Sequence, residues 1–340
     1  MKRHGKLWEK IVSFENIELA YTKAKKGKSK YSQVKEIENN PHKYLNELRQ
    51  SLIDGTFTTS QYKIKTIYEP KEREIYVLPF YPDRIVQHAI MNIVAPIWES
   101  MFINDSYACR IGKGQHKASQ RLMSFIRKKY IYYFQGDIKK FYPSINHKIL
   151  LQIIKHKIKD EKLILLFQDI IKSIGEETNV PIGNYTSQWF GNLYLNELDT
   201  FIKHKLKIKD YIRYNDDFIL FGNDKEKLKI IQESIRDFLK TKLDLTLSKE
   251  KIREVQKGIE FIGYKHYPEH IIIRKSSVKR MRKNIKIKHH KFVKNKITPS
   301  QFISTLQSIY GWLKWANTFN LKQQLNISNL LQEAENAKLS

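Results

Sequence analysis

Cysteine is nearly absent from the 340-residue chain, whose single example is Cys109. One cysteine excludes a disulfide scaffold, and it also excludes zinc fingers that are built on cysteine pairs. Long apolar runs are absent too, since none approaches the ~20 residues that a membrane-spanning helix needs. The polar residues 1–6 have no apolar segment behind them, so no signal peptide is apparent. We therefore expect a soluble, cytoplasmic protein.

Acidic residues are scarce, because 35 Asp and Glu stand against 62 Lys and Arg and leave a net charge of +27. Such a charge repels itself unless an anionic partner binds, whether nucleic acid, a membrane surface or an acidic protein. A Lys-rich composition can also reflect an AT-rich genome. Between His270 and Gln332, however, there is no acid at all among 13 Lys or Arg, 11 of which lie within 274–296. This distribution favours a phosphate-binding face over a merely solvated one. A membrane surface fits poorly because the stretch lacks a clear amphipathic anchor.

Apolar residues (41%) and aromatic residues (12%) are abundant enough for a packed core, and the length allows two or three subdomains. Apolar spacing and turn residues predict helices and strands in an irregular order. The expected helices cover 15–26, 41–52, 83–98, 150–174, 188–206 and 226–242; the expected strands cover 63–68, 74–78, 130–138, a hairpin at 211–221 and a pair at 259–267. This order fits a mixed α+β fold with antiparallel strands better than a repeating βα pattern.

Carboxylates stand in two apolar segments where they are costly. Asp137 ends the strand predicted at 130–138, and Asp216 and Asp217 interrupt the apolar run 211–221. Adjacent carboxylates repel each other and are unfavourable near a core unless a cation neutralises them. Asn215-Asp216 also forms turns readily, so a plain hairpin tip is the alternative. Three such carboxylates on neighbouring strands would suit Mg²⁺, and two ions ~4 Å apart support in-line phosphoryl transfer.

The order of the blocks carries more weight than Tyr-x-Asp-Asp alone, which is a weak motif. Asp137, then Pro181-Ile-Gly-Asn-Tyr-Thr-Ser-Gln188, then Tyr214-Asn-Asp-Asp217 resemble the three central palm motifs of a reverse transcriptase. The blocks at 83–88, 106–114, 245–252 and 261–264 are similar to flanking blocks of bacterial members, so that the resemblance runs from about residue 60 to 265. It implies a right-hand polymerase fold of the α+β class. The expected parts are an N-terminal helical extension (1–60), fingers (61–130), an antiparallel-sheet palm with helices (131–268) and a basic helical thumb (269–340).

The subtype rests on Ile182-Gly183 and Ser187-Gln188, which resemble the enzymes of diversity-generating retroelements. Asn215 departs from the pattern, since small or apolar residues are commoner there. The resemblance implies an error-prone RNA-directed DNA polymerase, encoded by a bacterium, archaeon or phage, that copies a template-repeat RNA into adenine-mutagenised cDNA. It also implies a small basic pentameric accessory protein as partner, beside template RNA, the RNA/cDNA duplex and dNTPs. A retron-like or antiviral-defence reverse transcriptase is the main alternative. A non-catalytic polymerase-fold RNA-binding protein is a third, against which the intact aspartates argue.

The resemblance assigns roles residue by residue. Two Mg²⁺ ions would be held by the carboxylates of Asp137, Asp216 and Asp217 and by the backbone carbonyl of Ile138. The incoming dNTP would meet Lys71, Arg73, Arg110, Tyr142, Ile182, Gly183 and Gln188. Lys251, or with less support Lys249, would protonate the leaving pyrophosphate. Phe261, Ile262, Gly263 and Tyr264 would form the primer grip, and Arg274, Lys275, Lys279, Arg280, Arg282 and Lys283 would contact nucleic acid.

Each of these assignments has a plainer structural alternative. Lys71, Arg73 and Lys251 could be solvated cations, Tyr142 a core tyrosine, and 261–264 a simple strand turn. The specific reading makes Tyr142 an aromatic gate against a ribose 2′-hydroxyl. Ile182 is either a core residue or a site where a lost hydrogen-bond donor loosens nucleotide discrimination opposite adenine.

Overall fold

The computed structural model describes residues 3–68 and 72–339. The described residues form two compact units: unit 1 takes those within 1–111, 136–218 and 230–250, and unit 2 those within 112–135, 219–229 and 251–340. Helices and antiparallel hairpins make up both units, which confirms the α+β class. The finer division into extension, fingers, palm and thumb stays a prediction.

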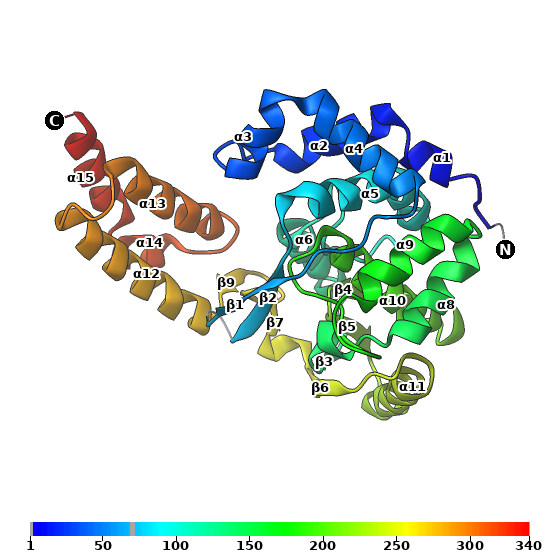
Figure 1. Ribbon diagram of the computed structural model, residues 1–340. Helices are drawn as coiled ribbons and strands as arrows, with labels where there is room; N and C mark the ends of the chain where they lie inside the picture. Colours follow the sequence, from blue (N-terminus) through cyan, green and yellow to red (C-terminus); the bar gives the residue numbers. More distant parts are fainter. Residues whose placement is uncertain (1–2, 69–71, 340) are drawn as a thin grey trace. The chain divides into compact units, whose positions relative to one another are not determined.

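Unit 1 begins with short helices that pack beside a long apolar one (Figure 1). They are α1 (Trp8–Ile11), α2 (Phe14–Lys25), α3 (Ser32–Asn39), α4 (Pro41–Ile53) and, after the π-helical turn η1 (Phe80–Arg84), α5 (Ile85–Glu99). Side-chain caps fix the residues at which two of these helices, α2 and α4, begin. The Ser13 side chain accepts from the backbone N–H of Asn16 ahead of α2, and the Asn40 side chain accepts from Lys43 while Pro41 opens α4. The predicted helices at 15–26, 41–52 and 83–98 are thus confirmed.

Helix α10 (Tyr185–Thr200) lies at the centre of unit 1, with twelve of its sixteen residues buried. Its Phe190 packs edge-on against Phe167 of α9 (Glu161–Lys172) and at a tilt against Trp98 of α5, with ring centroids 5.7 and 6.0 Å away. A helix buried on most sides has to be apolar on most sides, and polar residues on it need internal partners. Helix α10 continues into η2 (Phe201–Lys205), as the prediction for 188–206 required.

The single helix predicted at 150–174 is wrong, because two helices occupy this region. Helix α8 (His147–Lys157) ends before α9 begins, and Ile158 between them is extended and forms a parallel bridge with His4. Asp160 then caps α9 by accepting from the backbone N–H of Leu163. The same carboxylate accepts the backbone N–H groups of Leu7 and Trp8. The break is therefore fixed by contacts with the N-terminal segment.

A four-stranded sheet has the order β4-β5-β3-β6. Its strands are β3 (Tyr132–Ile138), β4 (Tyr211–Tyr214), β5 (Asp217–Gly222) and β6 (Leu247–Glu254), and helix α11 (Lys225–Leu243) lies between β5 and β6 in the sequence. The predicted strand at 130–138 and the hairpin at 211–221 are confirmed. Gly136 on β3 is needed because a Cβ there would collide with the ring of Phe218 on β5. A separate hairpin pairs β1 (Lys63–Ile67) with β2 (Arg73–Val77), Lys63 lying opposite Val77.

Unit 2 contains helix α6 (Gln115–Ile126), a small antiparallel sheet and a group of C-terminal helices. The sheet consists of β7 (Ile259–Phe261), β8 (Tyr264–His266) and β9 (Ile271–Ile273) in sequential order. The helices are α12 (Lys275–Val293), α13 (Pro299–Leu313), α14 (Phe319–Gln324) and α15 (Ile327–Leu339), with α13 packed against α12 and α15 (Figure 1).

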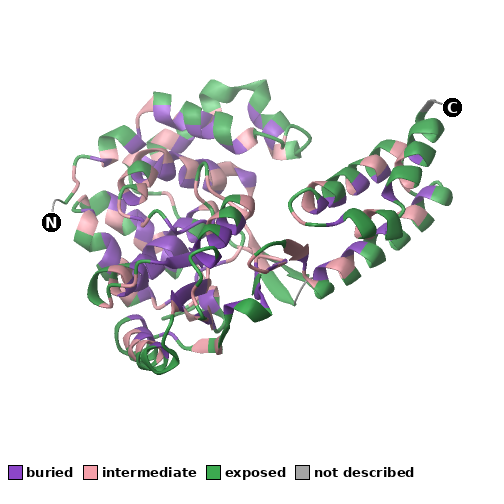
Figure 2. Ribbon diagram, turned by 180° about the vertical axis from the view of Figure 1, so that it is seen from behind, coloured by how far each residue is buried: buried purple, intermediate pink, exposed green. Residues whose placement is uncertain are grey.

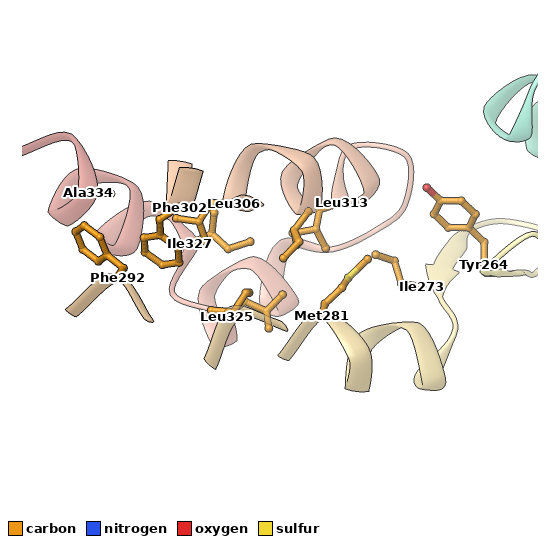
Figure 3. Packing of buried hydrophobic residues seen from close by; sticks show 12 residues of the cluster. Tyr264, Ile273, Met281, Phe292, Phe302, Leu306, Leu313, Leu325, Ile327 and Ala334 are labelled. Atoms are coloured by element: carbon orange, nitrogen blue, oxygen red, sulfur yellow. The ribbon is translucent and has the colours of Figure 1, made fainter. Parts of the chain in front are cut away.

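The C-terminal helices share an apolar core. Phe292, Phe302, Leu306, Leu313 and Ala334 belong to this core, which extends along the helices (Figure 3). Buried and exposed positions alternate along these helices (Figure 2), as expected for helices that bury one stripe each. Across the described range, no helix is both long and apolar enough to cross a membrane.

Candidate active site

Three carboxylates stand at the ends of adjacent strands in unit 1. Asp137 is the penultimate residue of β3, Asp216 lies in the two-residue turn after β4, and Asp217 opens β5. The backbone N–H of Ile138 donates to the carbonyl of Asp216 at 3.3 Å and ties the two strand ends together. Burial first, and then the charge of Asp137, raises the pKa of the Asp216 carboxyl. Asp137 and Asp216 therefore repel each other across the strand ends.

A cation would relieve this repulsion, and the donor chemistry suits a hard one. Magnesium takes carboxylate oxygens and usually completes its shell with water and substrate phosphates. Among the described residues, no group of three or more His, Cys, Asp or Glu side chains is gathered closely enough to form a cage by itself. An ion bound by one or two carboxylates and a phosphate needs no such cage, so the residues present fit Mg²⁺.

Ser248 is a neighbour of the site that the sequence did not reveal. Its hydroxyl Oγ donates to Oδ2 of Asp137 at 2.6 Å and lies 3.1 Å from the Asp137 carbonyl oxygen. The backbone N–H of Lys139 donates to Thr246 at 2.8 Å and sets the β6 segment beside β3. Only the resemblance of the block 245–252 pointed to this segment. Ser248 restrains the Asp137 carboxylate through Oδ2, so its other oxygen, Oδ1, is left for a metal ion.

Tyr142 and Asn215 form a short hydrogen-bonded bridge beside Asp216. The Tyr142 hydroxyl donates to Oδ1 of Asn215 at 3.2 Å, and Nδ2 of Asn215 donates to Oδ1 of Asp216 at 3.1 Å. Burial raises the pKa of the Tyr142 hydroxyl well above its ordinary value, which keeps this group a donor. The ring lies over Gly191 of α10, where a Cβ would sit 3.2 Å from a Tyr142 ring carbon.

A buried ion pair supports the turn that carries the aspartates. Arg213 on β4 and Asp199 on α10 are both fully buried, with 2.6 Å between Nη2 and Oδ2. Asp199 also accepts from the hydroxyl of Tyr211 at 2.7 Å. The guanidinium donates through Nη1 to the carbonyl of Asn215 at 3.0 Å and to the side-chain oxygen of Asn192 at 3.2 Å. The backbone of the turn is thereby anchored to the central helix.

The segment before α10 approaches the β1–β2 hairpin. The backbone N–H of Tyr76 on β2 donates to the carbonyl of Ile182 at 2.8 Å. Gly183 has φ +124°, and a Cβ there would collide with the Tyr76 carbonyl, so glycine is required. The side chain of Ile182 is half-buried, and Gln188 on the first turn of α10 is exposed.

Arg73 and Lys71 are the two cations near the β1–β2 hairpin that were predicted to meet the incoming dNTP. Arg73 is exposed at the start of β2, and its charge acts to lower the pKa of Asp216, against the larger effects of burial and Asp137. Its positive charge therefore reaches the carboxylate site. Lys71, the other predicted cation, lies outside the described residues.

Arg110 has a structural position rather than a free phosphate-binding one. Its guanidinium pairs with Glu99 at 2.7 Å and donates to the carbonyls of Ile103 and Ser106 at 2.6 and 2.8 Å. Its side chain is 5% exposed. Its bonds use four of the five N–H donors and connect α5 to the loop that precedes α6.

A family model for reverse transcriptase (RNA-dependent DNA polymerase) matches residues 42–266, a range that includes the β1–β2 hairpin and all three aspartates. The chain belongs to the reverse transcriptase family. It carries the domain of an RNA-directed DNA polymerase, and the polymerase fold expected from the sequence is confirmed. The subtype is not distinguished by this match, so the diversity-generating assignment stays a prediction.

Two similar proteins come from Escherichia coli and Lactococcus lactis. Protein YkfC of Escherichia coli K12 is 27% identical over 282 residues, a match that covers 68% of this chain and 72% of that protein. Group II intron-encoded protein LtrA of Lactococcus lactis is 25% identical over 297 residues, covering 65% of this chain and 49% of LtrA. The chain thus spans about half the length of LtrA. The apo telomerase of Candida tropicalis gives a TM-score of 0.49 at 14% identity, covering 88% of this chain and 63% of that one.

Unit 2 of the reverse transcriptase carries the remaining predicted site residues. Lys251 is half-buried on β6, and its role as an acid stays a prediction. The strand pair predicted at 259–267 is confirmed as β7 and β8, joined by Ile262 and Gly263 with φ +45° and +88°. A β-branched residue at positive φ is strained. Tyr264 stacks on Trp312 of α13, with ring centroids 5.3 Å apart.

The basic residues predicted to contact nucleic acid lie on or next to α12. Lys275, Lys279, Arg282 and Lys283 are exposed, whereas Arg274 and Arg280 are half-buried. Arg282 donates to the side-chain oxygen of Gln324 on α14 at 2.8 Å, and Arg280 lies 3.5 Å from the hydroxyl of Ser277. The apolar stripe of α12 faces α13, so its cations are left on the outside of this helix group.

Proposed function

We propose that this reverse transcriptase synthesises DNA on an RNA template by two-metal nucleotidyl transfer. The observation that carries the proposal is the pair of mutually repelling carboxylates, Asp137 and Asp216, at adjoining strand ends next to Asp217. Burying like charges together is unfavourable without a cation, and a polymerase site needs cations at this place. The family match over residues 42–266 supports the same activity.

The reaction joins the primer to the incoming nucleotide. The primer 3′-hydroxyl gives its proton to solvent water, and its oxygen forms a bond to the α-phosphorus of the dNTP. The bond from this phosphorus to the bridging oxygen of the β-phosphate breaks, and pyrophosphate leaves. Mg²⁺ held by Asp137, Asp216, Asp217 and the Ile138 carbonyl would make the 3′-hydroxyl more acidic and neutralise phosphate charge. Arg73 supplies positive charge for the triphosphate, and Lys251 supplies the proton that the pyrophosphate takes up.

Nucleotide choice is assigned to side chains around this centre. Tyr142 fills the space in which a ribose 2′-hydroxyl would lie. The side chain of Ile182 has no hydrogen-bond donor to offer the incoming nucleotide. Gln188 lies exposed on the following helix, α10. A site without a polar contact that reads geometry discriminates less between right and wrong nucleotides. This supports an error-prone enzyme that misincorporates opposite template adenine, as in a diversity-generating retroelement.

The exposed cations of α12 and the acid-free stretch around them support binding of template RNA and the RNA/cDNA duplex. The primer grip is assigned to the turn at 261–264. The pentameric accessory protein is a partner that the resemblance alone suggests.

A retron-like or defence reverse transcriptase shares every catalytic feature named so far, and the relatives YkfC and LtrA do not decide between the subtypes. The test is extension of a DNA primer on a defined RNA template with Mg²⁺ and dNTPs, followed by sequencing of the cDNA. Errors concentrated opposite adenine would support the diversity-generating subtype. Accurate synthesis would replace it with the retron-like or defence alternative.

Two variants make this test specific. Asp216→Asn should abolish synthesis; synthesis that survives it would contradict the proposed centre and favour a different site. Ile182→Gln should lower the error rate opposite adenine without a comparable change at other template bases. An unchanged error rate at adenine would remove Ile182 from the proposal.

A further inference from the structure

Asn215 lies between Tyr214 and Asp216, and its backbone has φ +57°. Asparagine tolerates this left-handed conformation better than most residues with a Cβ do. The turn alone therefore explains why asparagine is acceptable. It does not explain why both ends of the side-chain amide are engaged, one by Tyr142 and the other by Asp216.

Tyr142 is held on its backbone and over one ring face by other groups. Its carbonyl accepts from the backbone N–H groups of Val180 and Ile145 at 2.9 and 3.3 Å. Gly191 leaves the space over which the ring lies. Within the described residues, the hydroxyl has one hydrogen-bond partner, Asn215, at 3.2 Å. Rotation of the ring away from Gly191 is thus opposed at its tip by this one hydrogen bond.

Asn215 is itself fixed from the core of α10. Its carbonyl accepts from Arg213, which is paired with Asp199 in a fully buried environment. A continuous series of hydrogen bonds therefore runs from Asp199 through Arg213 and Asn215 to Tyr142. A steric filter excludes a group only as well as its own rotamer is held, because a ring that swings aside opens the space it filled.

We propose that Asn215 is a positioning residue that clamps the Tyr142 ring and thereby sets discrimination between deoxyribonucleotides and ribonucleotides. This inference rests on the proposed function for the role of Tyr142 as the sugar gate. The amide is suited to the task because it accepts from the tyrosine while it donates to Asp216, which an aspartate or an aliphatic residue at this position cannot do.

The test compares variants that remove either half of the bridge. Asn215→Gly deletes the amide and keeps a residue that tolerates positive φ, and Asn215→Ala deletes it with backbone strain added. Tyr142→Phe keeps the ring and removes the hydroxyl. Tyr194→Phe is the matched control, since this buried tyrosine in the same unit donates to the carbonyl of Leu243 at 2.6 Å away from the bridge.

Single-nucleotide incorporation of dGTP and GTP on a primed RNA template gives the ratio of kcat/KM values. We expect Asn215→Gly, Asn215→Ala and Tyr142→Phe each to lower this ratio about tenfold, mainly through a lower KM for GTP. The double variant Asn215→Gly with Tyr142→Phe should lower it no further, and Tyr194→Phe should leave it unchanged. An unchanged ratio in Asn215→Gly, or a double variant whose losses multiply, would overturn the proposal.

A second readout does not depend on polymerase activity. Denaturant titration gives the loss of unfolding free energy in Asn215→Gly, in Tyr142→Phe and in the double variant. If the bridge exists, the loss in the double variant should differ from the sum of the two single losses. Additive values would overturn the clamp even in an active enzyme. If the wild-type protein incorporates neither nucleotide, the proposed function fails, whereas non-additivity would still show that Asn215 holds Tyr142.

Discussion

The two units differ in how their charged side chains are arranged. Around the carboxylate site of unit 1, charges are individually fixed: Arg213 is fully buried against Asp199, and Asp137 is bonded to Ser248. In unit 2, cations are many and lie on the outside of helices whose inner sides are apolar. Chemistry at a phosphorus atom requires atoms placed to within a fraction of an ångström. Holding a phosphate backbone requires mainly charge density.

This contrast predicts that single substitutions in the two units differ greatly in effect. We expect the largest effect from Asp216→Asn, with synthesis reduced on the order of a thousandfold or more, since a group that holds the reacting charges is removed. Stability should move in the opposite direction. The raised pKa of Asp216 means that its ionised form destabilises the folded state near neutral pH, so the neutral asparagine should raise the unfolding midpoint.

Thermal unfolding with and without Mg²⁺ completes this first prediction. The ion should stabilise the wild-type protein more than Asp216→Asn, because it binds the ionised pair preferentially. A variant that is inactive and also less stable than the wild type would show that Asp216 acts as a structural residue.

The second prediction concerns the support of the turn. Asp199→Ala leaves the Arg213 guanidinium buried without its counter-ion, and breaking a buried pair in this way costs about 3–5 kcal/mol. Denaturant titration measures the loss. Lys229→Ala is the control for the bare loss of a salt bridge, because its pair with Glu226 is exposed and is expected to contribute ~0.5 kcal/mol or less. Equal losses in the two variants would contradict the anchoring role of the buried pair.

The third prediction uses the buried histidine of unit 2. His266 is fully buried between Ser119 and the carbonyl of Ile259, and burial lowers its pKa to about 4. The unfolded chain, with an ordinary pKa near 6.5, binds the proton more readily than the folded one between these values. Stability should therefore fall as the pH drops from about 6.5 to about 4, by up to about 3 kcal/mol.

The measurement is the free energy of unfolding as a function of pH for the wild type and His266→Asn. The variant should show a shallower fall over this range. His88 in unit 1 also has a pKa lowered to about 4, by burial and by neighbouring cations, and will leave a residual slope. Identical slopes in the two proteins would contradict the assignment to His266.

The sequence reveals the acids of the site because they violate a local rule. Asp137, Asp216 and Asp217 interrupt apolar strands, and such a violation is visible without any partner. The strands themselves follow from apolar runs, and helices α2, α4, α5, α10 and α11 follow from their spacing, whereas α6 does not appear among the predicted helices. The contacts that hold the site are not visible in this way. Arg213 also interrupts an apolar run, but only the fold shows that its partners are Asp199 and Asn215.

The same distinction explains the helix that was predicted as one and is two. Residues 150–174 have apolar residues at helical spacing on both sides of the polar stretch 155–162, in which Ile158 is the single apolar residue. Asp160 ends the continuity because its carboxylate caps α9 and also binds the backbone of Leu7 and Trp8. Long-range polar contacts of this kind are what the local pattern cannot supply. Ser248 beside Asp137, 111 residues away in sequence, is another example.

The smallest effects are expected on the basic face of α12, where no single cation is decisive. Lys279→Ala should weaken binding of an RNA/DNA duplex only a few-fold at moderate salt, and it should reduce the slope of log K against log salt by about 1. Fluorescence anisotropy with a labelled duplex over a series of salt concentrations measures both quantities. Lys227→Ala is the control, a lysine on α11 whose side chain is 80% exposed. If Lys279→Ala abolished binding outright, or left the slope unchanged, α12 would be a specific recognition element rather than a surface of summed charges, and the contrast between the two units would no longer hold.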